Sequence, residues 1–141
     1  MQALSASQAV DPTALITLHD QTRNALRGFA VMVEKAEPSF QGTARKFHAL
    51  HQHQAEALLH MLQAQGLEVD RDGTLMGTVN EVVVSLRAIF DEIDADTLQQ
   101  IRKGEDHILT AFDAAIAEQG GATADKLRAM RADLTQLLAA V

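Results

Sequence analysis

The stretch DTLQQIRKGEDHILTAFDAAIAE, from Asp96 to Glu118, carries the clearest structural signal in this sequence. Its apolar residues recur at the spacing of an amphipathic helix: Leu98, Ile101, Ile108, Phe112 and Ala115. Glu105 falls in the same stripe, on the side of the helix that should face a hydrophobic core. The stretch therefore predicts a core-facing helix with a carboxylate on its buried side.

Three more stretches show the same periodicity and predict helices over residues 13–37, 39–65 and 122–141. Asp11 and Pro12 suit the start of the first helix, because aspartate can cap it and proline is tolerated in a first turn. We expect Pro38 to stop that helix and Ser39 to cap the next one.

Glycines mark the expected ends of two helices. Gly66 suits the position just after the second helix, and Gly120-Gly121 suits the end of the helix that begins near Asp96. Residues 67–78, with Asp72-Gly73 and Gly77, predict a loop, and residues 79–90 predict a short helix.

The long connection decides the expected topology. About 28 residues separate Gly66 from Asp94, and at ~1.5 Å per helical residue and up to ~3.3 Å per extended residue they can return along a bundle of about 35 Å. The third long helix would then run parallel to the second. We therefore expect an all-α, ferritin-like four-helix bundle with a short extra helix in the long crossover. Residues 1–12 would form a flexible tail and residues 13–141 a single domain.

Composition limits the class of protein. Hydrophobic residues make up 47% of the chain and aromatic residues only 4%, which is typical of a helical bundle. Nineteen acidic against twelve basic residues give a net charge of −7, which argues against a nucleic acid or an anionic membrane as partner. There is no cysteine, no apolar run long enough to span a membrane and no basic start of a signal peptide. We expect a cytoplasmic protein.

One run of residues resembles a known family. Lys103-Gly104-Glu105-Asp106, followed by Phe112 six residues after the aspartate, is similar to a motif of the ferritin-like four-helix bundle family catalogued as domain-of-unknown-function family 2383. Gly73-Thr74, Gly77 and the pattern of the first two helices add to this similarity, which covers residues 13 to about 138. The resemblance implies a ferritin-like fold and no particular reaction.

The carboxylate sites of ferritin-like di-metal proteins need Glu-x-x-His on two helices, and this spacing is absent from the chain. A standard di-iron centre is therefore not expected. His53, Glu56 and His60 do share one face of the second helix, at spacings of three, four and seven residues. This face is a candidate surface site for a divalent metal; the alternatives are a solvated polar face and a contact between subunits.

Six polar side chains lie inside or at the edge of the apolar stripes: His19, Thr22, His51, Gln54, Glu105 and Arg131. If the second and third long helices are parallel, Glu105 lies level with His51, while Arg131 comes near Gln54 and Thr22. A buried carboxylate needs a cation or donors, so we expect Glu105 to be buried against His51 or Arg131. In an up-down-up-down bundle Glu105 would instead lie near His60.

Thr22, His51, Gln54, Glu105 and Arg131 therefore predict a hydrogen-bonded core network. A metal or small-molecule pocket is the alternative, with His51, Glu105 and His19 as metal ligands. No residue pattern indicates a nucleophile, a phosphate loop or a cofactor.

The leading hypothesis for function is a non-catalytic bundle that acts as a homo-oligomer or through a protein partner. The second hypothesis is a metal-binding or metal-dependent ferritin-like protein.

Overall fold

The structure, a computed structural model, describes residues 11–36, 38–68 and 95–141. These residues form four helices and no strand: α2 (Thr13–Lys35), α3 (Pro38–Ala64), α5 (Ala95–Gln119) and α6 (Gly121–Ala139). The all-α expectation is therefore confirmed for this part of the chain. The short helix expected over residues 79–90, and all but the first two residues of the loop expected over 67–78, lie outside the described residues.

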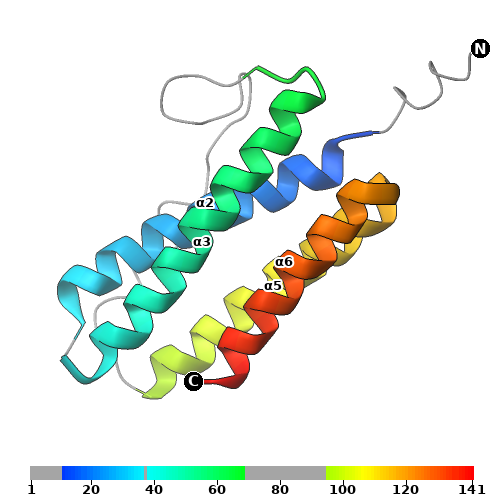
Figure 1. The fold of residues 1–141 in the computed structure, drawn as a ribbon. Helices are drawn as coiled ribbons and strands as arrows, with labels where there is room; N and C mark the ends of the chain where they lie inside the picture. Colours follow the sequence, from blue (N-terminus) through cyan, green and yellow to red (C-terminus); the bar gives the residue numbers. More distant parts are fainter. Residues whose placement is uncertain (1–10, 37, 69–94) are drawn as a thin grey trace, which may run out of the picture.

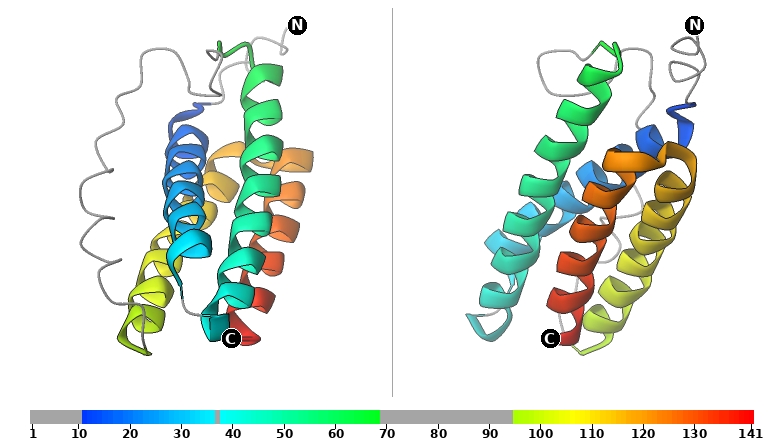
Figure 2. Two further views of the ribbon diagram at one scale, coloured as in Figure 1. Left: turned by 90° about the vertical axis from the view of Figure 1, so that its left-hand side faces the viewer. Right: turned by 45° about the vertical axis from the view of Figure 1, so that its right-hand side comes forward.

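The four helices pack as two antiparallel hairpins, α2 with α3 and α5 with α6 (Figure 1). Helices α3 and α5 begin at the same end of the bundle and run parallel, as the two views in Figure 2 also show. Helix α2 packs on both α3 and α5, and α6 packs on α5 and, over a smaller area, on α3. Parallel α3 and α5 exclude the up-down-up-down alternative.

The start of the first helix follows the sequence expectation, and the start of the second corrects it. One Asp11 carboxylate oxygen accepts the backbone N–H of Thr13 at 2.9 Å and so satisfies an amide of the first turn of α2. The expectation that Ser39 caps α3 was wrong, because the helix already begins at Pro38. Proline suits a first helical position, since it has no N–H to satisfy and its φ is already helical. Helix α2 also ends earlier than expected, at Lys35, and Ala36 is extended.

The turn that ends α3 explains why residue 66 is a glycine. This residue has φ of +90°, a conformation that costs glycine little. The Gly66 N–H donates to the Gln63 carbonyl at 2.9 Å, and the Leu67 N–H donates to the Leu62 carbonyl at 3.1 Å. These two bonds satisfy carbonyls that the helix end would otherwise leave unpaired.

The core lies between the two hairpins and consists of the predicted apolar stripes. Phe29 of α2 and Phe47 of α3 stack with ring centroids 5.0 Å apart, and Phe112 of α5 is fully buried. Most of the remaining core is aliphatic, as the low aromatic content predicts. Glu105 lies in this core with 2% of its surface exposed, so the stripe argument placed it correctly.

Candidate functional site: a buried glutamate and histidine

A glutamate and a histidine meet in the middle of the bundle. The His51 Nε2 atom lies 2.6 Å from the Glu105 Oε1 atom, and the two side chains are 0% and 2% exposed. His51 comes from α3 and Glu105 from α5, the two helices that run parallel on opposite corners of the bundle. The contact therefore joins the two hairpins through the core.

Aromatic rings cover one side of this pair. The His51 ring stacks on Phe29 at a centroid distance of 5.5 Å and on Phe47 at 6.4 Å. Such surroundings hold little water, so a polar contact inside them is electrostatically stronger than the same contact at the surface. They also fix the plane of the imidazole, which directs its Nε2 atom toward α5.

The other polar atom of each partner has no hydrogen bond. Both His51 Nδ1 and Glu105 Oε2 are buried without a partner. One proton between Nε2 and Oε1 is enough to make the contact a hydrogen bond. The core therefore satisfies one polar atom of each side chain and leaves the other unsatisfied, at a cost in free energy.

Thr22 and Gln54 are buried in the same bundle and make bonds of their own. The Thr22 hydroxyl donates to the Leu18 carbonyl within α2 at 2.8 Å. The Gln54 amide donates to the Met130 carbonyl of α6 at 2.8 Å, and its Oε1 atom has no partner. The expected five-residue network is therefore present only as separate contacts, because Thr22 and Gln54 bond to backbone carbonyls and not to the central pair.

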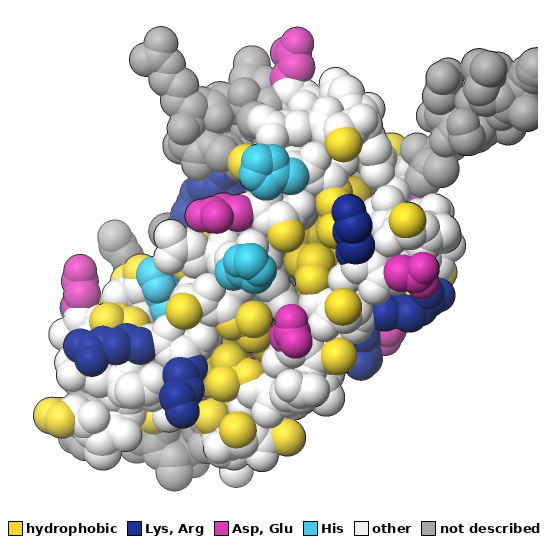
Figure 3. Space-filling view, in the orientation of Figure 1, with side chains coloured by type: hydrophobic (Ala, Val, Ile, Leu, Met, Phe, Trp, Pro, Cys, Tyr) yellow, Lys and Arg dark blue, Asp and Glu magenta, His cyan; other side chains and the backbone are white. Residues whose placement is uncertain are grey.

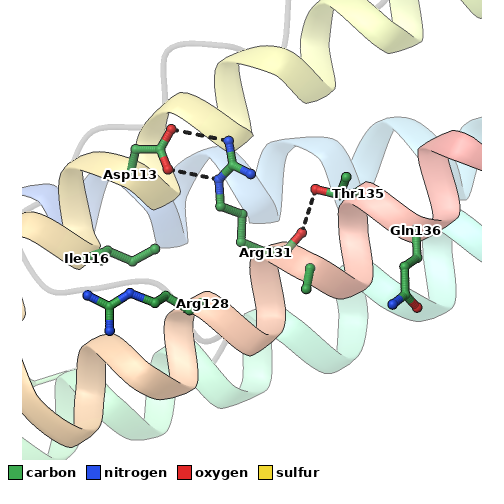
Figure 4. Close-up of a pocket in the computed structure, with 7 residues that line it drawn as sticks. Asp113, Ile116, Arg128, Arg131, Thr135 and Gln136 are labelled. Carbon is green, nitrogen blue, oxygen red and sulfur yellow. Dashed lines mark hydrogen bonds and ion pairs between the residues drawn. The ribbon is translucent and has the colours of Figure 1, made fainter.

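The Arg131 side chain pairs with a different carboxylate from that of Glu105. Its guanidinium forms a two-pronged ion pair with Asp113 of α5, with Nε–Oδ1 and Nη2–Oδ2 distances of 2.8 and 3.2 Å (Figure 4). Of the two partners expected for Glu105, His51 or Arg131, the structure has His51. Asp113 lies about two turns beyond Glu105 on α5 and is 61% exposed, so the arginine reaches it without leaving water.

His19 is buried on α2 and has a strongly shifted pKa. Burial and, to a smaller extent, the nearby positive charge of Arg23 together lower the pKa of His19 to about 4. The imidazole is therefore neutral at pH 7. Its Nδ1 atom has no hydrogen-bond partner, since the nearest carboxylate oxygen, on Asp20, is 3.9 Å away.

The surface candidates His53, Glu56 and His60 are all exposed on α3. Among the described residues, no three His, Asp or Glu side chains are grouped in a way that could hold a metal ion. Neither this set nor the core set of His19, His51 and Glu105 forms such a group in the structure. Metal binding by either set stays a prediction.

Two helix-end contacts were not predicted from the sequence. The Glu118 carboxylate, near the end of α5, accepts the backbone N–H groups of Ala14 and Leu15 at 2.7 and 3.2 Å. Arg102, near the start of the same helix, donates to the Leu138 carbonyl at the end of α6. Each charge has the sign that suits the helix end it meets. No signal within one helix could reveal them, because each contact joins residues far apart in sequence.

A histidine and a carboxylate can transfer a proton, but a substrate must reach them. In the part of the chain that the structure describes, His51 and Glu105 are almost completely buried. What the structure shows is a contact that joins α3 and α5 inside the core. None of the described helices is long and apolar enough to cross a bilayer.

The sequence model of the family described as Domain of unknown function (DUF2383) matches residues 12–118. The match covers most of the chain and includes α2, α3 and nearly all of α5, with both members of the buried pair. It ends earlier than the expected limit near residue 138. No curated protein and no solved structure matches the chain.

Proposed function

We propose that this chain, which belongs to the DUF2383 family, is a ferritin-like, non-catalytic helical bundle that acts by self-association. The observation that carries the proposal is an apolar strip between α3 and α6. Figure 3 shows hydrophobic side chains gathered along the line where these two helices face the viewer. This is also where the two hairpins make their least extensive contact.

The residues of the strip follow from one observed contact. Gln54 bonds to the backbone of Met130, so this side of α3 faces α6. Leu50, Ala57 and Met61 lie four, three and seven positions from Gln54 and therefore share its face. These three side chains are only partly buried.

The strip continues on α6. Met130 and Leu137, seven positions apart, share a face of that helix and are also only partly buried. A contiguous apolar strip between polar rims is typical of a surface that another protein covers. A second copy of the same chain is the partner we propose. In a dimer with two-fold symmetry, the same patch on each copy packs against its counterpart.

Sedimentation of the purified chain tests the proposal. We expect an oligomer at micromolar concentration, and we expect Ala57→Glu to shift it to the monomer, because a charge would be placed on the strip. Ala114→Glu makes the same change on an exposed position of α5 and should leave the oligomer intact. A wild-type monomer, or equal behaviour of the two variants, would rule out association through this face.

The ferritin-like assignment, with a crossover between α3 and α5, is part of this proposal and is supported by the parallel course of the two helices (Figure 2). A cytoplasmic location is also part of it, supported by the acidic, cysteine-free composition.

Metal binding is the second candidate function. Its supporting observation is that three of the predicted ligands have a buried nitrogen or oxygen atom without a partner: His19, His51 and Glu105. Metal analysis of protein purified without an affinity tag separates the candidates. A stoichiometric metal that disappears in Glu105→Ala would favour this second function.

A further inference from the structure

A cavity of about 210 Å³ lies between α2 and α3 and has no part in the buried pair or in the apolar strip. Its lining combines a buried histidine, one charged side chain from each helix, and apolar side chains: His19, Arg23 and Leu26 of α2, and Gln52, Ala55, Glu56 and Leu59 of α3. The cavity opens to solvent and leaves room for a small molecule.

The two charges of the cavity have opposite signs and come from different helices. Arg23 lies on α2 and Glu56 on α3, and no ion pair joins them, although both line the same space. One ligand can satisfy both if it carries a negative and a positive group of its own. A carboxylate would meet the Arg23 guanidinium, which binds planar anions through two hydrogen bonds, and an ammonium group would meet the Glu56 carboxylate.

The inner wall of the cavity includes a buried histidine. His19 lines the cavity and is only 1% exposed. Because its imidazole is neutral at pH 7, it adds no third charge beside Arg23 and Glu56.

The rest of the lining is apolar. Leu26, Ala55 and Leu59 provide contacts for a hydrocarbon side chain. We propose that this cavity binds a small zwitterion, an α-amino acid with an aliphatic side chain, with its carboxylate on Arg23, its ammonium on Glu56 and its side chain on these three residues.

The test is an NMR titration of the full chain with three probes of one carbon skeleton: L-leucine, isocaproate, which lacks the ammonium group, and isoamylamine, which lacks the carboxylate. We expect L-leucine at millimolar concentration to shift the signals of residues that line the cavity, including the His19 imidazole. Each of the other two probes should bind at least tenfold more weakly, because each leaves one charge of the cavity unmet.

Variants with matched controls identify the site. Arg23→Gln and Glu56→Gln should each weaken L-leucine binding about tenfold, and both keep a polar side chain of similar length so that the fold is retained. Arg27→Gln and Glu34→Gln make the same changes on α2 outside the cavity and should bind L-leucine like the wild type. Thermal midpoints close to that of the wild type would show that all four variants are folded.

Three results would overturn the proposal: no shift of cavity residues with L-leucine, equal binding of isocaproate or isoamylamine, or unchanged binding in both cavity variants. None of these results bears on self-association, which involves the α3–α6 face and is measured by sedimentation.

Discussion

Two carboxylates of α5 each meet a basic side chain, one inside the bundle and one at its surface. Glu105 contacts His51 at 2.6 Å, and both are almost completely buried. Asp113 holds Arg131 through two contacts, yet Asp113 is 61% exposed and Arg131 33% exposed. The surface pair makes two contacts, one of them a hydrogen bond, and the buried pair makes one contact. Its water-exposed charges nevertheless gain little from each other, whereas the buried pair cannot lose a partner without leaving a desolvated polar group behind.

The comparison is tested most strongly by Glu105→Ala. We expect a loss of about 2–4 kcal/mol in the free energy of unfolding, because the substitution leaves a cavity and an imidazole nitrogen with no partner in the core. Glu105→Gln keeps the shape and an oxygen acceptor and should lose less. Urea unfolding measures both values. A loss for Glu105→Ala as small as that of a surface variant would show that burial does not increase the contribution of this pair to the free energy of unfolding.

The second test concerns His19, which is buried without the carboxylate partner that His51 has. Its pKa is about 4 in the folded chain and 6.5 in the unfolded chain. Between these values the unfolded state binds more protons, so the free energy of unfolding falls as the pH falls from about 6.5 to 4. We expect His19 to account for a loss on the order of 2 kcal/mol over this range.

Urea unfolding at several pH values, for the wild type and for His19→Gln, isolates this contribution. Asp20, next to His19, has a pKa raised by burial and so contributes with the opposite sign at the acidic end. The difference between wild type and variant removes that contribution, because both chains keep Asp20. Parallel pH profiles of the two chains would contradict the predicted role of His19.

The smallest effect is expected at the surface pair. Asp113→Ala should lower the free energy of unfolding by about 0.5 kcal/mol, because water already solvates both charges well. This loss should largely vanish at roughly 1 M salt, where the screening length is about 3 Å. The loss in Glu105→Ala should persist at that salt concentration, since ions do not reach the core. A salt-independent loss of several kcal/mol in Asp113→Ala would remove the distinction between the two pairs.

The buried pair could be predicted from the sequence because its evidence is periodic. Glu105 falls in a stripe of apolar residues on one helix, and His51 falls in the stripe of another. The length of the connection then indicated a parallel course, which brings both residues to the same level. The burial of Glu105 and its position level with His51 could therefore both be predicted from the sequence.

Arg131 shows the limit of this reasoning. Its level was estimated correctly to within one residue, since Met130 is the residue that Gln54 contacts. The direction of the Arg131 side chain could not be predicted, because an arginine at the edge of a stripe can turn to either neighbouring helix. The position of Asp113 on the facing side of α5 decides that direction, and this depends on how α5 and α6 pack.

The presence of the four described helices, the apolar stripes and the burial of Glu105 were determined by the sequence itself, because they depend on residues a few positions apart on one helix. The partner of Arg131, the capping of α2 by Glu118 and the cavity that combines Arg23 with Glu56 were decided only by the tertiary structure. Each of these joins side chains on different helices, and the rotation of one helix against another is set by packing of the whole core.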